Sequence, residues 1–254
     1  MKAEVFADYA AYYDLLYKDK DYAAEADYVE HLVRRQRPLS SGWKVLDVGS
    51  GTGRHALAFA RRGHSVVGVD ASEQMVRLAK EAAGASVKFV VGDARHFRLD
   101  ERFPVVLSLF HVASYQTGTS DLLAYFQSVG AHLEPDGLFI FDCWYGPAVL
   151  HQKPSLRVRE LEDENLKVLR IARPELMPEE NCVVVEYEVL VERKADGRLQ
   201  RLHESHCMRY LFLPEIQDLL ERAGLELLSC EEWMTGKPLG LETWSACLIA
   251  GKKS

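Results

Sequence analysis

The amino-acid sequence predicts an α/β fold, in which a doubly wound parallel sheet carries an antiparallel β insertion. Between Trp43 and Trp144, short runs of β-branched residues alternate with helical stretches, which is the pattern of a parallel sheet with helices on both faces. From about residue 149 to residue 210 the strand-like segments have no helices between them, as in antiparallel sheets. The 254 residues, 48% of them hydrophobic, suffice to bury such a core.

Seven strands are expected in the core sheet, because seven short runs are rich in Val, Ile, Leu and Phe. They are Lys44–Gly49, Ser65–Val69, Val87–Val91, Val105–Phe110, Gly137–Cys143, Leu225–Glu231 and Trp244–Ala250.

Helices are expected between these strands. The stretches HALAFARRG, SEQMVRLAKEAAG and SDLLAYFQSVGAHL repeat apolar residues at intervals of three and four, as amphipathic helices do. Ser72 and Ser120 stand at the expected N-caps, and Gly137 is expected to close the loop before the fifth strand. A last helix is predicted over Leu213–Ala223, with Pro214 in its first turn.

Three parts are expected along the chain. Residues 1–40 are expected to form a helical cap, since residues 9–37 are amphipathic and contain six tyrosines. Residues 41–148 and 211–254 form the α/β core, and residues 149–210 form the insertion, with ADGR (Ala195 to Arg198) as a hairpin turn. The tyrosine-rich helices offer a contact surface for a homodimer.

Composition narrows the class of protein. The net charge of −7 argues against nucleic acid as a partner, because phosphate backbones are bound by positive surfaces. The N-terminus lacks a secretion signal, and no run of about 18 apolar residues occurs, so no membrane association is predicted and a cytoplasmic location is the simplest expectation. The five cysteines are widely spaced and never form a C-x-x-C pair, so neither a disulfide framework nor a metal site is predicted.

A glycine-rich loop follows the first strand in VLDVGSGTGRH (Val45 to His55). In a doubly wound sheet this loop meets the ligand. A nucleoside triphosphate is not indicated, because no lysine follows as in G-x-x-x-x-G-K-[ST]. The spacing also differs from the G-x-G-x-x-G of dinucleotide sites. Asp47 would repel a pyrophosphate but would suit a ligand that carries an ammonium group.

Two further acids stand at strand tips. Asp70 ends the second strand, where its carboxylate could accept hydrogen bonds from both hydroxyls of a ribose. Asp93 follows the third strand, where its carboxylate or the neighbouring amides could meet the edge of an adenine ring. Together with the glycine loop, they indicate an adenosine with an ammonium-bearing tail and no phosphate, a description that S-adenosylmethionine fits.

These motifs resemble those of the class I S-adenosylmethionine-dependent methyltransferases. The resemblance rests on the glycine loop, Asp70, Gly92-Asp93-Ala94 and LEPDGLFIF before the fifth strand. It implies a Rossmann-like sheet of seven strands, S-adenosylmethionine as cofactor and methyl transfer to a small acceptor, with the insertion as acceptor lid. The expected cofactor-binding residues are Tyr13, Tyr22, Asp47, Gly49, Ser50, Gly51, Gly53, Asp70, Ala71, Met75, Gly92, Asp93, Ala94, Leu109 and Phe110.

The flanking segments resemble two narrower groups. YYDLLYKDKDYAAEA, LHESHCMRYLF and LPEIQDLLERAGLEL resemble nucleotide-sugar N,N-dimethyltransferases that act on aminosugars. That resemblance implies that Tyr13 and Tyr22 approach the methionine carboxylate of the cofactor, although both tyrosines also suit packing on the core. LFHVASYQT and FDCWYGP are more similar to methyltransferases of bacterial surface polysaccharides. The expected acceptor is therefore a nucleotide-linked sugar, with N- and O-methylation both open.

The catalytic candidates are His111, Tyr115 and His206. A hydroxyl acceptor needs a base, and an amine must lose its proton. His111 follows the fourth strand and Tyr115 lies one turn later; the alternative for His111 is a structural loop histidine. His206 faces the site if its strand closes over it, and solvent otherwise.

Three further residues are candidates for binding the acceptor. Asp142 and Trp144 stand at the carboxyl end of the fifth strand, and the indole offers a stacking surface for a ring. Arg209 is one of four insertion arginines, with Arg157, Arg159 and Arg170, that could neutralise a substrate pyrophosphate. A solvated basic edge is the alternative interpretation of these arginines.

Other functions stay open at this point. They are methyl transfer to a different small metabolite, cofactor binding without catalysis, and an NAD(P) oxidoreductase, which the glycine spacing and Asp47 disfavour.

Overall fold

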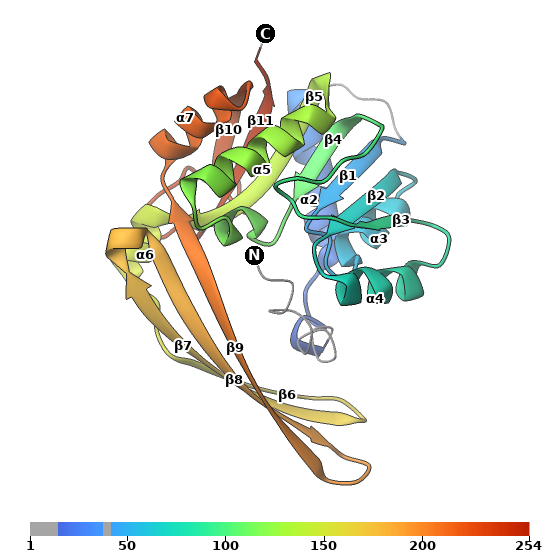
Figure 1. The fold of residues 1–254 in the computed structure, drawn as a ribbon, viewed down its shortest axis with the longest axis vertical. Helices are drawn as coiled ribbons and strands as arrows, with labels where there is room; N and C mark the ends of the chain where they lie inside the picture. Colours follow the sequence, from blue (N-terminus) through green and yellow to red (C-terminus); the bar gives the residue numbers. More distant parts are fainter. Residues whose placement is uncertain (1–14, 38–41, 254) are drawn as a thin grey trace.

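The computed structural model describes residues 15–37 and 42–253 and has the predicted Rossmann-like α/β fold with an antiparallel β insertion (Figure 1). Seven strands form the core sheet in the order β3-β2-β1-β4-β5-β11-β10, and β11 runs antiparallel to both of its neighbours. The strands are β1 Lys44–Val48, β2 Ser65–Asp70, β3 Lys88–Val91, β4 Phe103–Ser108, β5 Leu133–Tyr145, β10 Leu225–Glu232 and β11 Ser245–Lys252.

Helices cover both faces of the core sheet (Figure 1). α2, α3 and α4 pack against one face, and α5 and α7 pack against the other. The helices are α2 Tyr22–Gln36, α3 Arg54–Ala60, α4 Glu73–Ala83, α5 Thr119–His132, α6 Gly146–Gln152 and α7 Leu213–Arg222, with short 3-10 helices η2 Val112–Tyr115 and η3 Pro178–Glu180. Two apolar layers, one on each face of the sheet, form the core.

Three local predictions were wrong. β4 ends at Ser108 rather than Phe110, because Phe110 and His111 take left-handed backbone angles (φ 70° and 66°) that a strand does not allow. β5 begins at Leu133, so Gly137 lies inside the strand. The N-cap of α5 is Gly118 rather than Ser120. Here a tertiary contact holds the helix start, since Arg209 donates to the carbonyl of Thr117 and the hydroxyl of Thr119.

Other local predictions are confirmed. The hydroxyl of Ser72 accepts from the main-chain N–H of Met75 and caps α4. α7 has Pro214 in its first turn. Arg193 pairs with Arg198 across the ADGR turn, in which Gly197 has a φ of 66°.

The insertion forms a long curved antiparallel sheet, which we call the arm (Figure 1). Its strands are β6 Arg157–Glu162, β7 Leu166–Met177, β8 Cys182–Arg193 and β9 Arg198–Leu211. At its base, β9 pairs in parallel with β5, with Tyr210 beside Trp144 and Leu211 beside Tyr145. The arm therefore grows out of the core sheet itself.

The inner face of the arm rests on the core through a small apolar cluster. The cluster joins arm residues to the segment before α2 and to α4. Its buried members are Leu15, Leu16, Met75, Val168, Val189 and Leu202.

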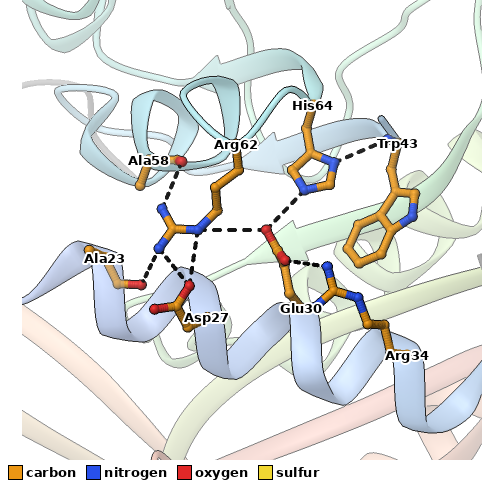
Figure 2. Close-up of polar contacts among 8 residues, drawn as sticks. All are labelled: Ala23, Asp27, Glu30, Arg34, Trp43, Ala58, Arg62 and His64. Atoms are coloured by element: carbon orange, nitrogen blue, oxygen red, sulfur yellow. Dashed lines mark hydrogen bonds and ion pairs between the residues drawn. The ribbon is translucent and has the colours of Figure 1, made fainter. Parts of the chain in front are cut away.

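A polar network around the buried Glu30 and His64 fixes α2 to the core (Figure 2). Glu30 of α2 lies 3.1 Å from His64 Nε2 and 2.6 Å from the Arg34 guanidinium. His64 Nδ1 accepts from the main-chain N–H of Trp43, so its proton sits on Nε2 and is donated to Glu30. Arg62 bonds to Asp27 and to the carbonyls of α2 and α3. α2 is thus held in place beside the site described next.

In the described part of the chain, no helix combines the length and the apolar character that crossing a membrane requires.

Candidate active site

A cavity opens at the carboxyl ends of the parallel strands, between the core, the segment before α2 and the inner face of the arm. Tyr17 contributes from that segment, and Tyr187 and Met208 contribute from the arm. The predicted site residues that line it are Tyr22, Gly49, Ser50, Gly51, Asp70, Met75, Leu109, Phe110, His111, Tyr115 and Trp144. Residues far apart in the sequence therefore meet around one space.

The glycine loop forms the floor of this cavity. Gly49, Gly51 and Gly53 all have positive φ, at 77°, 54° and 78°, a region that favours glycine. A methyl group on Gly49 would overlap the side chain of Val112, whereas one on Gly51 would meet open space. The absence of a side chain at Gly49 therefore leaves room for Val112, and its absence at Gly51 leaves the backbone open.

Asp70 supports the loop from the tip of β2. Its two carboxylate oxygens accept hydrogen bonds from the main-chain N–H groups of Gly51 (2.8 Å) and Ser72 (2.9 Å). Burial raises its pKa, and these two hydrogen bonds lower it. The carboxylate reaches the cavity and retains capacity to accept hydroxyl donors. The bare loop and this acid fit the ribose and the cationic tail of S-adenosylmethionine.

Asp47 lies beneath the loop instead of at its surface. It is 2% exposed and does not line the cavity. Burial raises its pKa to about 6, against the effect of nearby His55. One of its oxygens has no hydrogen-bond partner. The carboxylate of Asp47 therefore lies behind the loop and does not reach the cavity.

In the motif after β3, the carboxylate of Asp93 is held by a neighbouring arginine. Both oxygens of Asp93 are bound by the guanidinium of Arg95, at 2.9 Å and 2.6 Å. This hydrogen bonding is the largest influence on the carboxyl and lowers its pKa to about 2. Gly92, Asp93 and Ala94 do not line the cavity. The carboxylate is occupied, which leaves the main-chain amides as the groups of this loop suited to an adenine edge.

A histidine and a buried aspartate meet at the end of β4 and β5. Nδ1 of His111 lies 2.8 Å from Oδ2 of Asp142, and the main-chain N–H of His111 donates to Oδ1 (3.0 Å). Burial raises the pKa of Asp142, but the charge and hydrogen bonds of His111 outweigh it and hold the pKa below its usual value. His111 lines the cavity and Asp142 lies behind it. The left-handed backbone of His111 is a strained arrangement of the kind that clusters at functional sites.

Tyr115 and His206 meet across the cavity wall. The hydroxyl of Tyr115 lies 2.8 Å from Nδ1 of His206 on the arm. His206 is 4% exposed and lies behind Tyr115, so it faces inward and not into solvent. Burial raises the pKa of Tyr115 well above its usual value, which keeps the phenol protonated. Trp144 lines the cavity near His111, with ring centres 6.3 Å apart.

The predicted residues Gly53, Ala71 and Arg209 do not line the cavity either. Tyr13 lies outside the described residues. Arg209 is 6% exposed, is paired with Glu215 and bonds to Thr117 and Thr119. Its guanidinium thus holds the base of the arm and does not line the cavity.

A polar cluster that the sequence did not predict lies on the α2 side of the cavity. Nζ of Lys20 is paired with Glu25 and lies 4.6 Å from the ring centre of Phe110. Glu25 Oε2 lies 2.6 Å from His55 Nε2, and Tyr22 packs edge-on against His55 at 4.9 Å. An acid in the first turn of a helix, such as Glu25, and a lysine just before the helix, such as Lys20, are both ordinary in a sequence. Nothing in the sequence pattern therefore marks either residue.

Known proteins are similar to this chain in both sequence and fold. A family model described as a methyltransferase domain matches residues 45–137. The chain is 37% identical over 235 residues to a dTDP-3-amino-3,4,6-trideoxy-alpha-D-glucopyranose N,N-dimethyltransferase of Streptomyces venezuelae, which covers 92% of this chain and 94% of that relative. It is 28% identical over 242 residues to a dTDP-3-amino-3,6-dideoxy-alpha-D-glucopyranose N,N-dimethyltransferase of Streptomyces fradiae, over 94% and 90% of the two chains.

Solved structures agree over nearly the whole chain. DesVI of Streptomyces venezuelae superposes with a TM-score of 0.82 at 26% identity, covering 97% of this chain and 99% of that one. CalS10, an S-adenosylmethionine-bound amino pentose methyltransferase of Micromonospora echinaspora, gives a TM-score of 0.76 at 25% identity over 98% of each chain. The similarity includes the arm as well as the core.

Proposed function

Because this chain belongs to the class I S-adenosylmethionine-dependent methyltransferases and is related to dTDP-aminosugar N,N-dimethyltransferases, we propose that it methylates the amine of a nucleotide-linked aminosugar. The observation that carries this proposal is the placement of the His111–Asp142 pair at the wall of the cavity, beside the glycine loop and Asp70. The names of the relatives supply the class of acceptor.

The cofactor would be held by the core side of the cavity. The glycine loop and Asp70 would bind its amino-acid and ribose parts, with Met75 and Leu109 as apolar neighbours. Tyr22 is proposed to face the methionine end, and Tyr13 is proposed with it from the resemblance alone. When bound, S-adenosylmethionine supplies an electrophilic methyl group on a sulfonium, whose leaving group is neutral.

The remaining groups would prepare the acceptor. An amine reaches the site largely as an ammonium ion, and its nitrogen needs a free lone pair to attack. With Nδ1 of His111 held against Asp142, Nε2 is the ring nitrogen that exchanges a proton with a ligand. The buried carboxylate stabilises the imidazolium that results. His111 would thus act as the general base. Such a base typically accelerates a reaction by about a hundredfold to ten-thousandfold.

The arm would cover the acceptor. Tyr187 and Met208 bring it to the cavity wall, and residues 149–210 are proposed as the acceptor lid for that reason. Trp144 would stack on the sugar ring, since an indole presents an apolar face next to His111. Alignment of amine and methyl carbon in a closed cavity supplies the rest of the rate.

A direct test uses the purified chain, S-adenosylmethionine and a panel of dTDP-linked sugars that carry an amine or only hydroxyls. Mass spectrometry should detect one or two added methyl groups on the aminosugar nucleotides. Methylation confined to the hydroxyl-only sugars would overturn N-methylation. Transfer to none of the panel, by protein that binds the cofactor in calorimetry, would overturn the nucleotide-sugar assignment.

A further inference from the structure

A chain of three polar side chains links the cavity to the inner face of the arm. Tyr115 lines the cavity, and its hydroxyl lies 2.8 Å from Nδ1 of His206. Nε2 of the same ring lies 3.4 Å from Oε2 of Glu204. His206 and Glu204 are 4% and 8% exposed. They stand two residues apart on β9, so both side chains point to the same face of the arm.

The carboxylate of Glu204 decides where the protons of this chain lie. A carboxylate only accepts hydrogen bonds, so the ring nitrogen facing it should carry a proton. If Nε2 carried no proton, it and the Glu204 carboxylate would be two hydrogen-bond acceptors facing each other at 3.4 Å. In a buried place this arrangement costs free energy. In neutral His206 the proton is then on Nε2, and Nδ1 is an acceptor. The Tyr115 hydroxyl must donate to it, because its pKa is raised by burial and it stays protonated.

The direction of the Tyr115 proton defines what the cavity can recognise. An oxygen that has given its only proton to His206 offers a ligand nothing but lone pairs. This oxygen and Nε2 of His111 are then two of the hydrogen-bond acceptors that the cavity presents. A hydroxyl has one proton and satisfies one of them. A primary or secondary ammonium group has at least two protons. It can transfer one proton to His111, which frees its lone pair, and donate a hydrogen bond to Tyr115 with another.

We propose that Glu204 is a positioning residue that, through His206, turns Tyr115 into an obligate hydrogen-bond acceptor and so selects an amine over a hydroxyl as the methyl acceptor. The proposal rests on the proposed function for the identity of the acceptor, but its structural part does not. Glu204 touches neither acceptor nor cofactor in this scheme; its effect reaches them through two side chains.

The proton positions can be measured on the protein alone. Uniformly ¹⁵N-histidine-labelled protein gives ring nitrogen shifts that distinguish the two neutral tautomers and the imidazolium. The His206 signals are assigned by their through-space contacts to the Tyr115 and Tyr187 rings, since the Tyr187 ring centre lies 5.0 Å from that of His206. The expected result is a neutral ring with its proton on Nε2. A proton on Nδ1, or on both nitrogens, at neutral pH overturns the proposal.

Variants test whether the carboxylate matters for turnover. Glu204→Met removes the acceptor while keeping the length of the side chain, and Tyr115→Phe removes the oxygen. Each should lower kcat/KM with a dTDP-linked aminosugar by about tenfold or more, with the dissociation constant of S-adenosylhomocysteine unchanged in calorimetry. Glu204→Gln should restore most of the activity, because its amide oxygen can still accept from Nε2.

The outer face of the arm provides a matched control, formed by His203 of β9 and Glu186 of β8. His203 lies 3.4 Å from Glu186 on the outer, exposed face of the arm, so Glu186→Met breaks an equivalent pair without touching the cavity. This control should keep wild-type kcat/KM. Equal activity of Glu204→Met and Glu186→Met would overturn the proposal. Absence of turnover by the wild-type protein would instead overturn the proposed function, with the His206 tautomer still deciding the role of Glu204.

Discussion

His111 and Asp142 make two contacts through different atoms: the ring Nδ1 lies 2.8 Å from one carboxylate oxygen, and the main-chain N–H donates to the other at 3.0 Å. One buried carboxylate thereby fixes both the backbone and the ring of the same residue. The left-handed φ of His111, 66°, is stabilised by this pair of contacts.

His111→Asn should lower kcat by about a hundredfold to ten-thousandfold, because it removes the proposed base. Cofactor affinity, measured by calorimetry, should stay within about twofold of the wild type, since the cofactor is proposed to contact other walls. His151→Asn is the control, because His151 lies 3.6 Å from Glu242 at the surface. An Asn variant of His111 with undiminished kcat would rule out the base.

Asp70→Asn should weaken S-adenosylmethionine binding by about tenfold to a hundredfold. The change keeps the size of the side chain and removes the charge that would strengthen hydrogen bonds from the ribose hydroxyls, an effect of about 1.5–3 kcal/mol. Isothermal calorimetry measures it directly. The matched control Asp93→Asn alters a carboxylate already occupied by Arg95 and should have a smaller effect on binding. Unchanged affinity in the Asp70 variant would exclude the ribose role.

Asp47→Asn should stabilise the protein at pH 8 by about 3 kcal/mol and weaken cofactor binding. The folded pKa of about 6 exceeds the ordinary 3.8, so the folded protein binds more protons than the unfolded chain between these values. The wild-type penalty therefore grows as pH rises through this window and is complete above it. Denaturant unfolding at pH 8 and at pH 4 measures the difference, which should nearly vanish at the lower pH. A larger gain at pH 4 would contradict burial as the cause.

Gly49→Ala should destabilise the fold more than Gly224→Ala does. Both glycines have positive φ, 77° and 75°, so both variants carry a backbone cost of about 1–2 kcal/mol. Only at Gly49 does the added methyl also overlap Val112; at Gly224 it meets open space. Adding Val112→Ala to Gly49→Ala should restore the additional stability that the overlap removes. Urea unfolding midpoints measure this difference. Equal costs for the two single variants would remove the overlap argument.

Glu30→Ala should lower the free energy of unfolding by about 1–3 kcal/mol, because it leaves buried His64 and the neighbouring arginines without their shared acceptor (Figure 2). Glu81→Ala breaks the exposed Arg77–Glu81 pair and should cost less than about 0.5 kcal/mol. Thermal or urea unfolding compares them. Similar losses in both would show that the network adds nothing beyond a surface pair.

The core fold and the cofactor loop were predictable because their signals are local. Strand and helix periods, the glycine spacing and the acids at strand tips all lie within a few residues of one another. The roles of Glu204, Lys20 and Arg209 could not be predicted in this way. Each depends on partners brought from another part of the chain: His206 and Tyr115 for Glu204, Phe110 for Lys20, and Glu215 with the start of α5 for Arg209.

Strand β9 runs unbroken from the tip of the arm at Arg198 to Leu211, where it hydrogen-bonds into the core sheet beside β5. Such a strand bends along its length and has no joint at which it could swing. The arm is therefore fixed to the core sheet at its base, and near its tip it packs against Leu15 and Leu16. If the arm is the acceptor lid proposed above, an acceptor would enter by displacing its free end from Leu15 and Leu16. The ease of opening would then depend on residues distant from the transferred methyl group.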